Sequence, residues 1–175
     1  GQVTSLYTLS IPNYQLVVNM AGELVETSVD NGDGTFTYNV PVREGYTWSD
    51  GSPITANDWE FTFDTVKSLS LGGNFLSSYP YSCEDEEGTA KNCVVSVVAS
   101  DDYTVSITFN YDPGLSTWQY GTAQGIAFSK AYWEQYATDK ETLYAHDATN
   151  APVASAFVYD KLEQGAFYTW KYDAN

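Results

Sequence analysis

Apolar and polar positions alternate over two stretches of the chain and thereby predict two β-strands, across 35–42 and 103–109. A period of two is that of a strand with one face buried. The Asn-Gly and Asp-Gly pairs within 31–34 supply residues that tolerate the positive φ angles of tight turns. We therefore expect hairpins that turn near 31–34 and near the acidic pair in 100–102.

A different period follows the second turn-rich segment and predicts a helix over 56–67. Thr55 stands at the N-cap position, and Asp58 follows three residues later in a capping-box arrangement. Apolar residues then recur at i, i+4 and i+7 as Trp59, Phe63 and Val66. This spacing gives the helix one apolar face, and we expect it to be the longest helix of the chain or nearly so.

The remaining segments predict mostly short elements. Two apolar clusters within 3–20 indicate short strands, and the Gly-, Ser- and acid-rich stretch 68–92 indicates a long loop. A helix is expected over 129–136, and a last hairpin over 157–172 with its turn at 163–165. The predicted fold class is therefore α+β, a β-rich mixed domain with hairpins and a few short helices.

Length and composition bound the kind of molecule. The chain has 175 residues, of which 43% are hydrophobic, so it is one domain or part of one with a real core. Its net charge is −16 with only seven Lys and Arg, which argues against nucleic acid and anionic membrane surfaces as partners. No apolar run is long enough to span a membrane, so we expect no direct membrane insertion.

Catalytic and metal-binding patterns are weak. His146 is the only histidine, and no sequence feature nominates a nucleophile for it, so a surface histidine is the better interpretation. A calcium loop starting at Asp30 would place Gly32, Gly34 and Pro41 at its third, fifth and twelfth positions, where oxygen ligands are needed. We therefore predict neither an enzyme nor a resident metal or cofactor.

Sixteen residues between positions 26 and 58 follow one recognisable motif: Glu26, Ser28, Asp33, Gly34, Thr35, Thr37, Arg43, Gly45, Trp48, Ser49, Asp50, Gly51, Pro53, Thr55, Ala56 and Asp58. This segment resembles the signature of the extracellular solute-binding proteins of peptide-type ABC transporters, family 5. The resemblance continues in the hairpin 94–109 through Asp101, Asp102, Thr104 and Val105. It spans roughly 20–175, with departures at 39–42, at Trp59 and at 154–159.

The resemblance implies a part of a two-lobed, periplasmic-binding-protein-like architecture of the peptide-binding type. Residues 1–175 would be a single fragment with part of lobe one and the small β-rich domain, the second lobe being absent. In that family an oligopeptide or similar small solute is enclosed between two lobes and passed to an ABC transporter permease. The expected location is extracellular or periplasmic, with a lipoprotein anchor in the full-length protein.

Aromatic residues in loops are the candidates for ligand contact if this chain contributes to such a cleft. The aromatic candidates are Tyr79, Tyr81, Trp118 and Tyr120, and Gln124 beside them is a polar candidate. Ordinary packing is the competing interpretation for each of them. A self-contained secreted carbohydrate-binding or adhesion module is the alternative function, because aromatic platforms with carboxylates suit sugars.

Cys83 and Cys93 bracket an acidic stretch, and no histidine lies near them to complete a zinc site. An extracellular location, as the resemblance implies, favours a local disulfide between the two. A reduced pair remains the alternative if the compartment is different.

Overall fold

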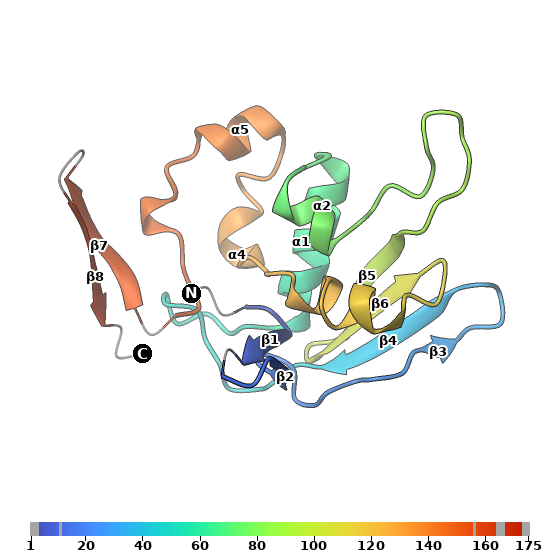
Figure 1. Ribbon diagram of the computed structural model, residues 1–175. Helices are drawn as coiled ribbons and strands as arrows, with labels where there is room; N and C mark the ends of the chain where they lie inside the picture. Colours follow the sequence, from blue (N-terminus) through green and yellow to red (C-terminus); the bar gives the residue numbers. More distant parts are fainter. Residues whose placement is uncertain (1–3, 11, 156, 164–166, 173–175) are drawn as a thin grey trace.

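The structure is a computed structural model that describes residues 4–10, 12–155, 157–163 and 167–172 (Figure 1). The described residues form the predicted mixed α and β fold. The strands are β1 (Tyr7–Ser10), β2 (Gln15–Val18), β3 (Val29–Asp30), β4 (Phe36–Pro41), β5 (Val94–Asp101), β6 (Thr104–Phe109), β7 (Phe157–Glu163) and β8 (Phe167–Tyr172). The helices are α1 (Ala56–Ser68), α2 (Asn74–Ser78), α3 (Gly114–Trp118), α4 (Lys130–Trp133) and α5 (Lys140–Ala145), with 3-10 turns η1 (Thr122–Gln124) and η2 (Ala148–Asn150).

A four-stranded antiparallel sheet in the order β3-β4-β6-β5 forms the centre of the fold. Its register pairs Tyr38 with Ile107 and Val40 with Val105, so these side chains share one face and are buried there. Polar residues take the other face, where the hydroxyls of Thr37 and Thr108 lie 2.9 Å apart. The strands predicted from alternation, and the hairpins near 31–34 and 100–102, are thereby confirmed.

Helix α1 covers the buried face of the sheet and is the longest helix among the described residues. Trp59, Phe63 and Val66 are fully buried, as their spacing predicts. At its start the Asp58 carboxylate accepts a hydrogen bond from the Thr55 backbone N–H at 2.9 Å. This contact satisfies a donor that the helix itself cannot pair.

Two predicted segments differ in the structure. The stretch 68–92 is not loop throughout, because it contains the short helix α2. The helix predicted over 129–136 ends at Trp133 and continues as hydrogen-bonded turns, in which Tyr136 N–H donates to the Trp133 carbonyl. Both elements are short helices whose stability depends on tertiary packing more than on sequence periodicity.

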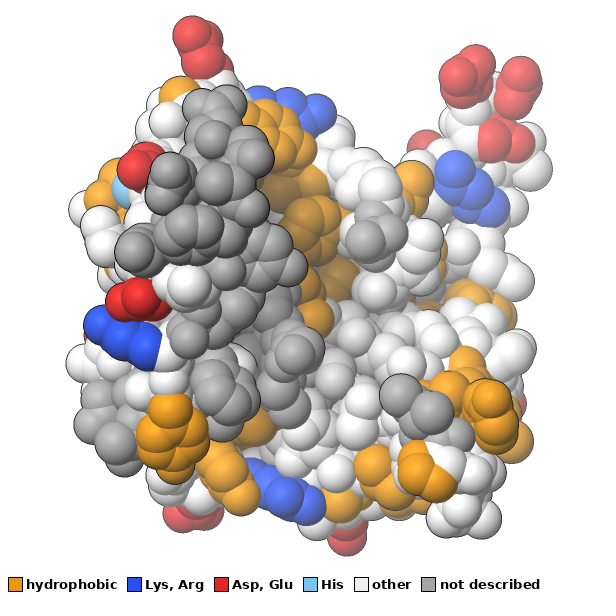
Figure 2. Space-filling model, turned by 60° about the vertical axis from the view of Figure 1, so that its left-hand side comes forward, with side chains coloured by type: hydrophobic (Ala, Val, Ile, Leu, Met, Phe, Trp, Pro, Cys, Tyr) orange, Lys and Arg blue, Asp and Glu red, His pale blue; other side chains and the backbone are white. Residues whose placement is uncertain are grey.

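Two hairpins complete the described fold. The N-terminal strands β1 and β2, where the sequence predicts only short strands or extended segments, pair as a two-stranded sheet. The predicted hairpin β7-β8 forms another two-stranded sheet. Residues 164–166, which include most of the predicted turn at 163–165, lie outside the described residues. The segment between α2 and β5 projects from the body of the molecule (Figure 1), and Figure 2 shows acidic side chains gathered at a projecting tip.

Candidate functional site

The candidate ligand residues lie on two segments that pack against each other, the loop after α2 and the stretch from α3 to η1. Gly125, directly after η1, lies so close to Tyr79 that an added Cβ would be 2.9 Å from the Tyr79 hydroxyl oxygen. A larger residue at this position would therefore displace the tyrosine. The structure thus brings Tyr79 and Gln124 into one region from 45 positions apart in the sequence.

Trp118 and Tyr79 are the buried members of this region. The Trp118 ring stacks on Tyr38 with centroids 4.0 Å apart, and its indole N–H donates to the Val25 carbonyl at 2.8 Å. Tyr79 packs edge-to-face against Phe63, and burial raises the pKa of its hydroxyl. Within the described residues both side chains contribute to the core and hold the neighbouring loops in place.

Tyr81, Tyr120 and Gln124 reach the surface to different degrees. The Tyr81 hydroxyl donates to the Leu71 carbonyl at 3.4 Å from a half-buried position. Tyr120 is 52% exposed, and the half-buried Gln124 donates its amide to the Gln119 carbonyl at 3.3 Å. Tyr120 is therefore the exposed candidate, whereas Tyr81 and Gln124 are half-buried.

Three of the five buried side-chain polar atoms that lack a partner among the described residues lie on the same segments. They are the Tyr79 hydroxyl, the Gln119 side-chain nitrogen and the Thr122 hydroxyl, while the other two belong to Trp59 and Ser129. Buried polar groups are nearly always hydrogen-bonded in folded proteins, to protein, water or ligand. Sequence reasoning missed Gln119 and Thr122, although the two glycines at 121 and 125 that bracket η1 signal a close backbone approach.

Asp58 of the family-like motif joins three segments through its carboxylate. Its carboxylate accepts hydrogen bonds from the Trp48 indole N–H at 3.2 Å and from the backbone N–H of Thr55 and Lys130 at 2.9 and 2.8 Å. Burial raises the pKa of this carboxyl, and the three hydrogen bonds oppose that shift. The motif residues are thus positioned to fix the start of α1 against α4.

His146 belongs to an aromatic cluster with Tyr132, Trp133 and Tyr136. Its ring stacks on Tyr136 with centroids 3.5 Å apart, and one ring nitrogen lies 2.9 Å from the Tyr132 hydroxyl. The histidine is half-buried, so packing explains it better than an open surface position. It anchors the segment after α5 to the turns after α4.

Cys83 and Cys93 form the expected disulfide, with Cα atoms 5.1 Å apart. It ties the base of the projecting segment to the start of β5. In the part of the chain that the structure describes, no group of three or more His, Cys, Asp or Glu could hold a metal ion. No helix there is long and apolar enough to cross a membrane.

The fold is that of solved solute-binding proteins. It is similar to the oligopeptide-binding protein AppA of Bacillus subtilis, solved with a nonapeptide, with a TM-score of 0.71, 16% identity and coverage of 98% of this chain and 30% of that one. It is also similar to NikZ of Campylobacter jejuni, solved with Ni(L-His), with a TM-score of 0.68, 16% identity and coverage of 98% and 30%.

Sequence comparison gives the family. Residues 19–175 match the bacterial extracellular solute-binding proteins, family 5 Middle, and the chain belongs to this family, which consists of binding proteins and not of enzymes. The oligopeptide-binding protein OppA of Bacillus subtilis is 33% identical over 93 residues. That match covers 49% of this chain and 16% of OppA, so the chain spans a minor part of the length of such relatives.

Proposed function

We propose that this chain is part of the extracellular solute-binding component of an ABC importer, which captures an oligopeptide or similar small solute for a membrane permease. The family match over 19–175 is the observation that carries this function. The similar structure of AppA was solved with a nonapeptide, and the relatives OppA and DppE are described as oligopeptide- and dipeptide-binding proteins.

The chain supplies part of lobe one together with the small β-rich domain, and a second lobe completes the cleft. Coverage of only about a third of each similar structure supports this division, since AppA is covered over 30% of its length. Ligand sites commonly lie at domain interfaces, where hinge closure buries most of the ligand. The full-length protein is held at the cell surface, with a lipoprotein anchor as the simplest attachment.

The stretch from α3 to η1 and the loop after α2 form this chain's side of the cleft. Tyr120 contacts the ligand directly because it is the exposed candidate, and the half-buried Gln124 on the same segment contributes its side-chain amide. Tyr79 and Trp118 are buried in the core and hold these segments in place, whereas Tyr81 is only partly buried. The buried polar atoms of the same segments supply further hydrogen-bonding capacity beside Tyr120 and Gln124.

Calorimetry with a peptide library tests this function on the 175-residue chain and on the longer protein that includes the second lobe. A single lobe keeps roughly half the contacts but the whole association cost, so its affinity falls by at least about a hundredfold. Equal, tight binding by both proteins would contradict the two-lobe proposal. It would favour a self-contained module, and oligosaccharides in the same titrations identify the carbohydrate-binding form of that alternative.

Point variants in the longer protein test the contact residues. Tyr120→Ala weakens peptide binding by at least about fivefold if the ring contacts ligand, since truncation of an aromatic contact costs about 1–3 kcal/mol. Tyr46→Ala is the matched control, because Tyr46 is 49% exposed and lies outside these segments. Equal affinities for the two variants would remove Tyr120 from the contact set.

A further inference from the structure

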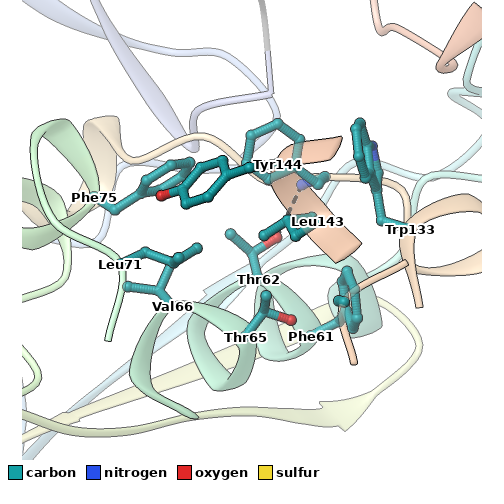
Figure 3. A pocket seen from close by; sticks show the side chains of 11 residues that line it. Phe61, Thr62, Thr65, Val66, Leu71, Phe75, Trp133, Leu143 and Tyr144 are labelled. Carbon is teal, nitrogen blue, oxygen red and sulfur yellow. Dashed lines mark hydrogen bonds between the residues drawn. The ribbon is translucent and has the colours of Figure 1, made fainter. Parts of the chain in front are cut away.

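The side of α1 that faces away from the sheet lines an apolar pocket, called here the α1 pocket. The pocket is about 190 Å³ in volume and lies between α1, α2, α4 and α5. Figure 3 shows Thr65 and Val66 of α1 facing Phe75 and Trp133 across it, with Leu143 also directed into the space. Figure 2 likewise shows hydrophobic side chains within a hollow near the middle of one face of the molecule.

Aromatic rings form one continuous wall of the pocket. Phe75 contacts Phe128 with ring centroids 5.6 Å apart, and Phe128 contacts Trp133 at 6.0 Å. These contacts join α2 to α4 through a loop residue, so the wall is held from both ends. Tyr144, which is 70% exposed, stands at the mouth.

The chemistry of the lining selects neutral ligands. No Asp, Glu, Lys, Arg or His lines the pocket, although the chain carries 23 acidic residues. The Thr62 hydroxyl is already engaged, since it donates to the Asp58 carbonyl at 2.6 Å and accepts from the Phe128 N–H at 2.9 Å. The Thr65 hydroxyl, the Tyr144 hydroxyl and the Trp133 indole N–H also line the pocket and make no hydrogen bond among the described contacts. The indole N–H can only donate and Tyr144 stands at the mouth, so the Thr65 hydroxyl is the acceptor inside the pocket.

The size of the pocket fits a small ring system. Protein interiors rarely contain voids larger than a water molecule. Apolar cavities of roughly 150 Å³ stay dry and bind benzene-sized molecules. At about 190 Å³ the α1 pocket exceeds that size and is open at one side.

We infer that the α1 pocket is a second binding site, which takes an uncharged aromatic compound of one or two fused rings, with the Thr65 hydroxyl accepting its single polar N–H or O–H. None of the candidate contacts for the transported solute lines this pocket. The inference is therefore independent of the proposed function, and each can fail without the other.

Indole is the probe, titrated into the longer protein that includes the second lobe while the methyl resonances of Val66, Leu71 and Leu143 are followed by NMR. We expect saturable shifts of these methyls with a dissociation constant on the order of 1 mM or tighter. Indole-3-acetate, which adds a carboxylate, should bind at least about tenfold more weakly because the pocket offers no cation. Absence of saturation, or equal binding of the two probes, overturns the inference.

A filled pocket provides the second test. Ala137→Phe places a ring in the space that the ligand would occupy and should weaken indole binding at least about tenfold. Ala131→Phe is the matched control, since Ala131 is exposed on α4 and does not line the pocket. Equal indole affinity of the two variants overturns the site. So does a wild-type dimer that Ala137→Phe abolishes, because a second copy would then occupy the pocket.

Discussion

The two sides of α1 pack differently. On the sheet side, Trp59 and Phe63 lie in a continuous core in which the rings of Tyr38 and Trp118 stack 4.0 Å apart. On the opposite side, Phe61 and Thr65 line the α1 pocket instead of meeting a filled surface. The sheet side is built from long elements with a regular period, whereas the pocket side is built from helices of four to six residues. Side chains are therefore densely packed where α1 meets the sheet, and open space remains where α1 meets the short helices.

Trp118→Ala should produce the largest effect and tests the dense side. Truncating a fully buried tryptophan commonly costs about 3–5 kcal/mol in unfolding free energy, and Trp118 is 0% exposed. Urea unfolding followed by circular dichroism measures the change. Tyr120→Ala on the same segment should stay within about 0.5 kcal/mol of wild type, and similar losses for both would contradict the packing contrast.

Reduction of the Cys83–Cys93 disulfide should have the next largest effect on stability. The loss should be greatest on the pocket side of α1. The bridge closes a loop with a sequence separation of 10. By restricting the unfolded chain, it should stabilise the fold by about 3 kcal/mol or less. Because it anchors the segment that follows α2, hydrogen exchange should rise most in α2 after reduction. Free-thiol titration of unreduced, denatured protein provides the check, and two reactive thiols per chain would refute the bridge.

Ionisation of Tyr7 should destabilise the dense side of α1 at alkaline pH. Burial raises the pKa of its hydroxyl to about 12 from 10.0, and its oxygen accepts the Val25 N–H at 2.6 Å. The folded chain therefore holds this proton more tightly than the unfolded chain does, so the stabilisation is complete below pH 10 and is lost as pH rises through 12.

The Tyr7 effect is at most about 3 kcal/mol, since the shift spans about two pKa units and each unit corresponds to about 1.4 kcal/mol. Urea unfolding at pH 8 and at pH 11–12 should show a smaller decline for Tyr7→Phe than for wild type. Parallel declines in the two proteins would show that Tyr7 ionises equally well in both states.

The contrast between the two sides of α1 also explains which elements could be predicted from the sequence. Alternation and capping predicted β4, β6 and α1 because each carries its own period over six residues or more. Helix α2 was missed because five residues in a polar stretch carry no period, and their packing partner Phe128 lies far along the chain.

The candidate site could be predicted only in part from the sequence, for a related reason. Tyr79, Trp118 and Tyr120 were chosen as aromatic residues in loops, but their exposure differs widely. What buries Trp118 is Tyr38, eighty residues earlier in the chain, and what confines Tyr79 is the absence of a side chain at Gly125. Both depend on tertiary neighbours, which no local pattern encodes.

The last comparison enlarges one alanine in the dense core and one in the α1 pocket. The two substitutions should change the free energy of unfolding in opposite directions. Ala123 is fully buried in η1, so Ala123→Leu forces extra volume into a filled core and should cost about 1–3 kcal/mol. Ala137 lines the α1 pocket of about 190 Å³, so Ala137→Leu adds apolar contacts in available space. Cavity filling of this kind commonly stabilises by about 0.5–2 kcal/mol. Urea midpoints of the two variants should therefore move in opposite directions from wild type, and a fall in both would show that the pocket side is as tightly packed as the sheet side.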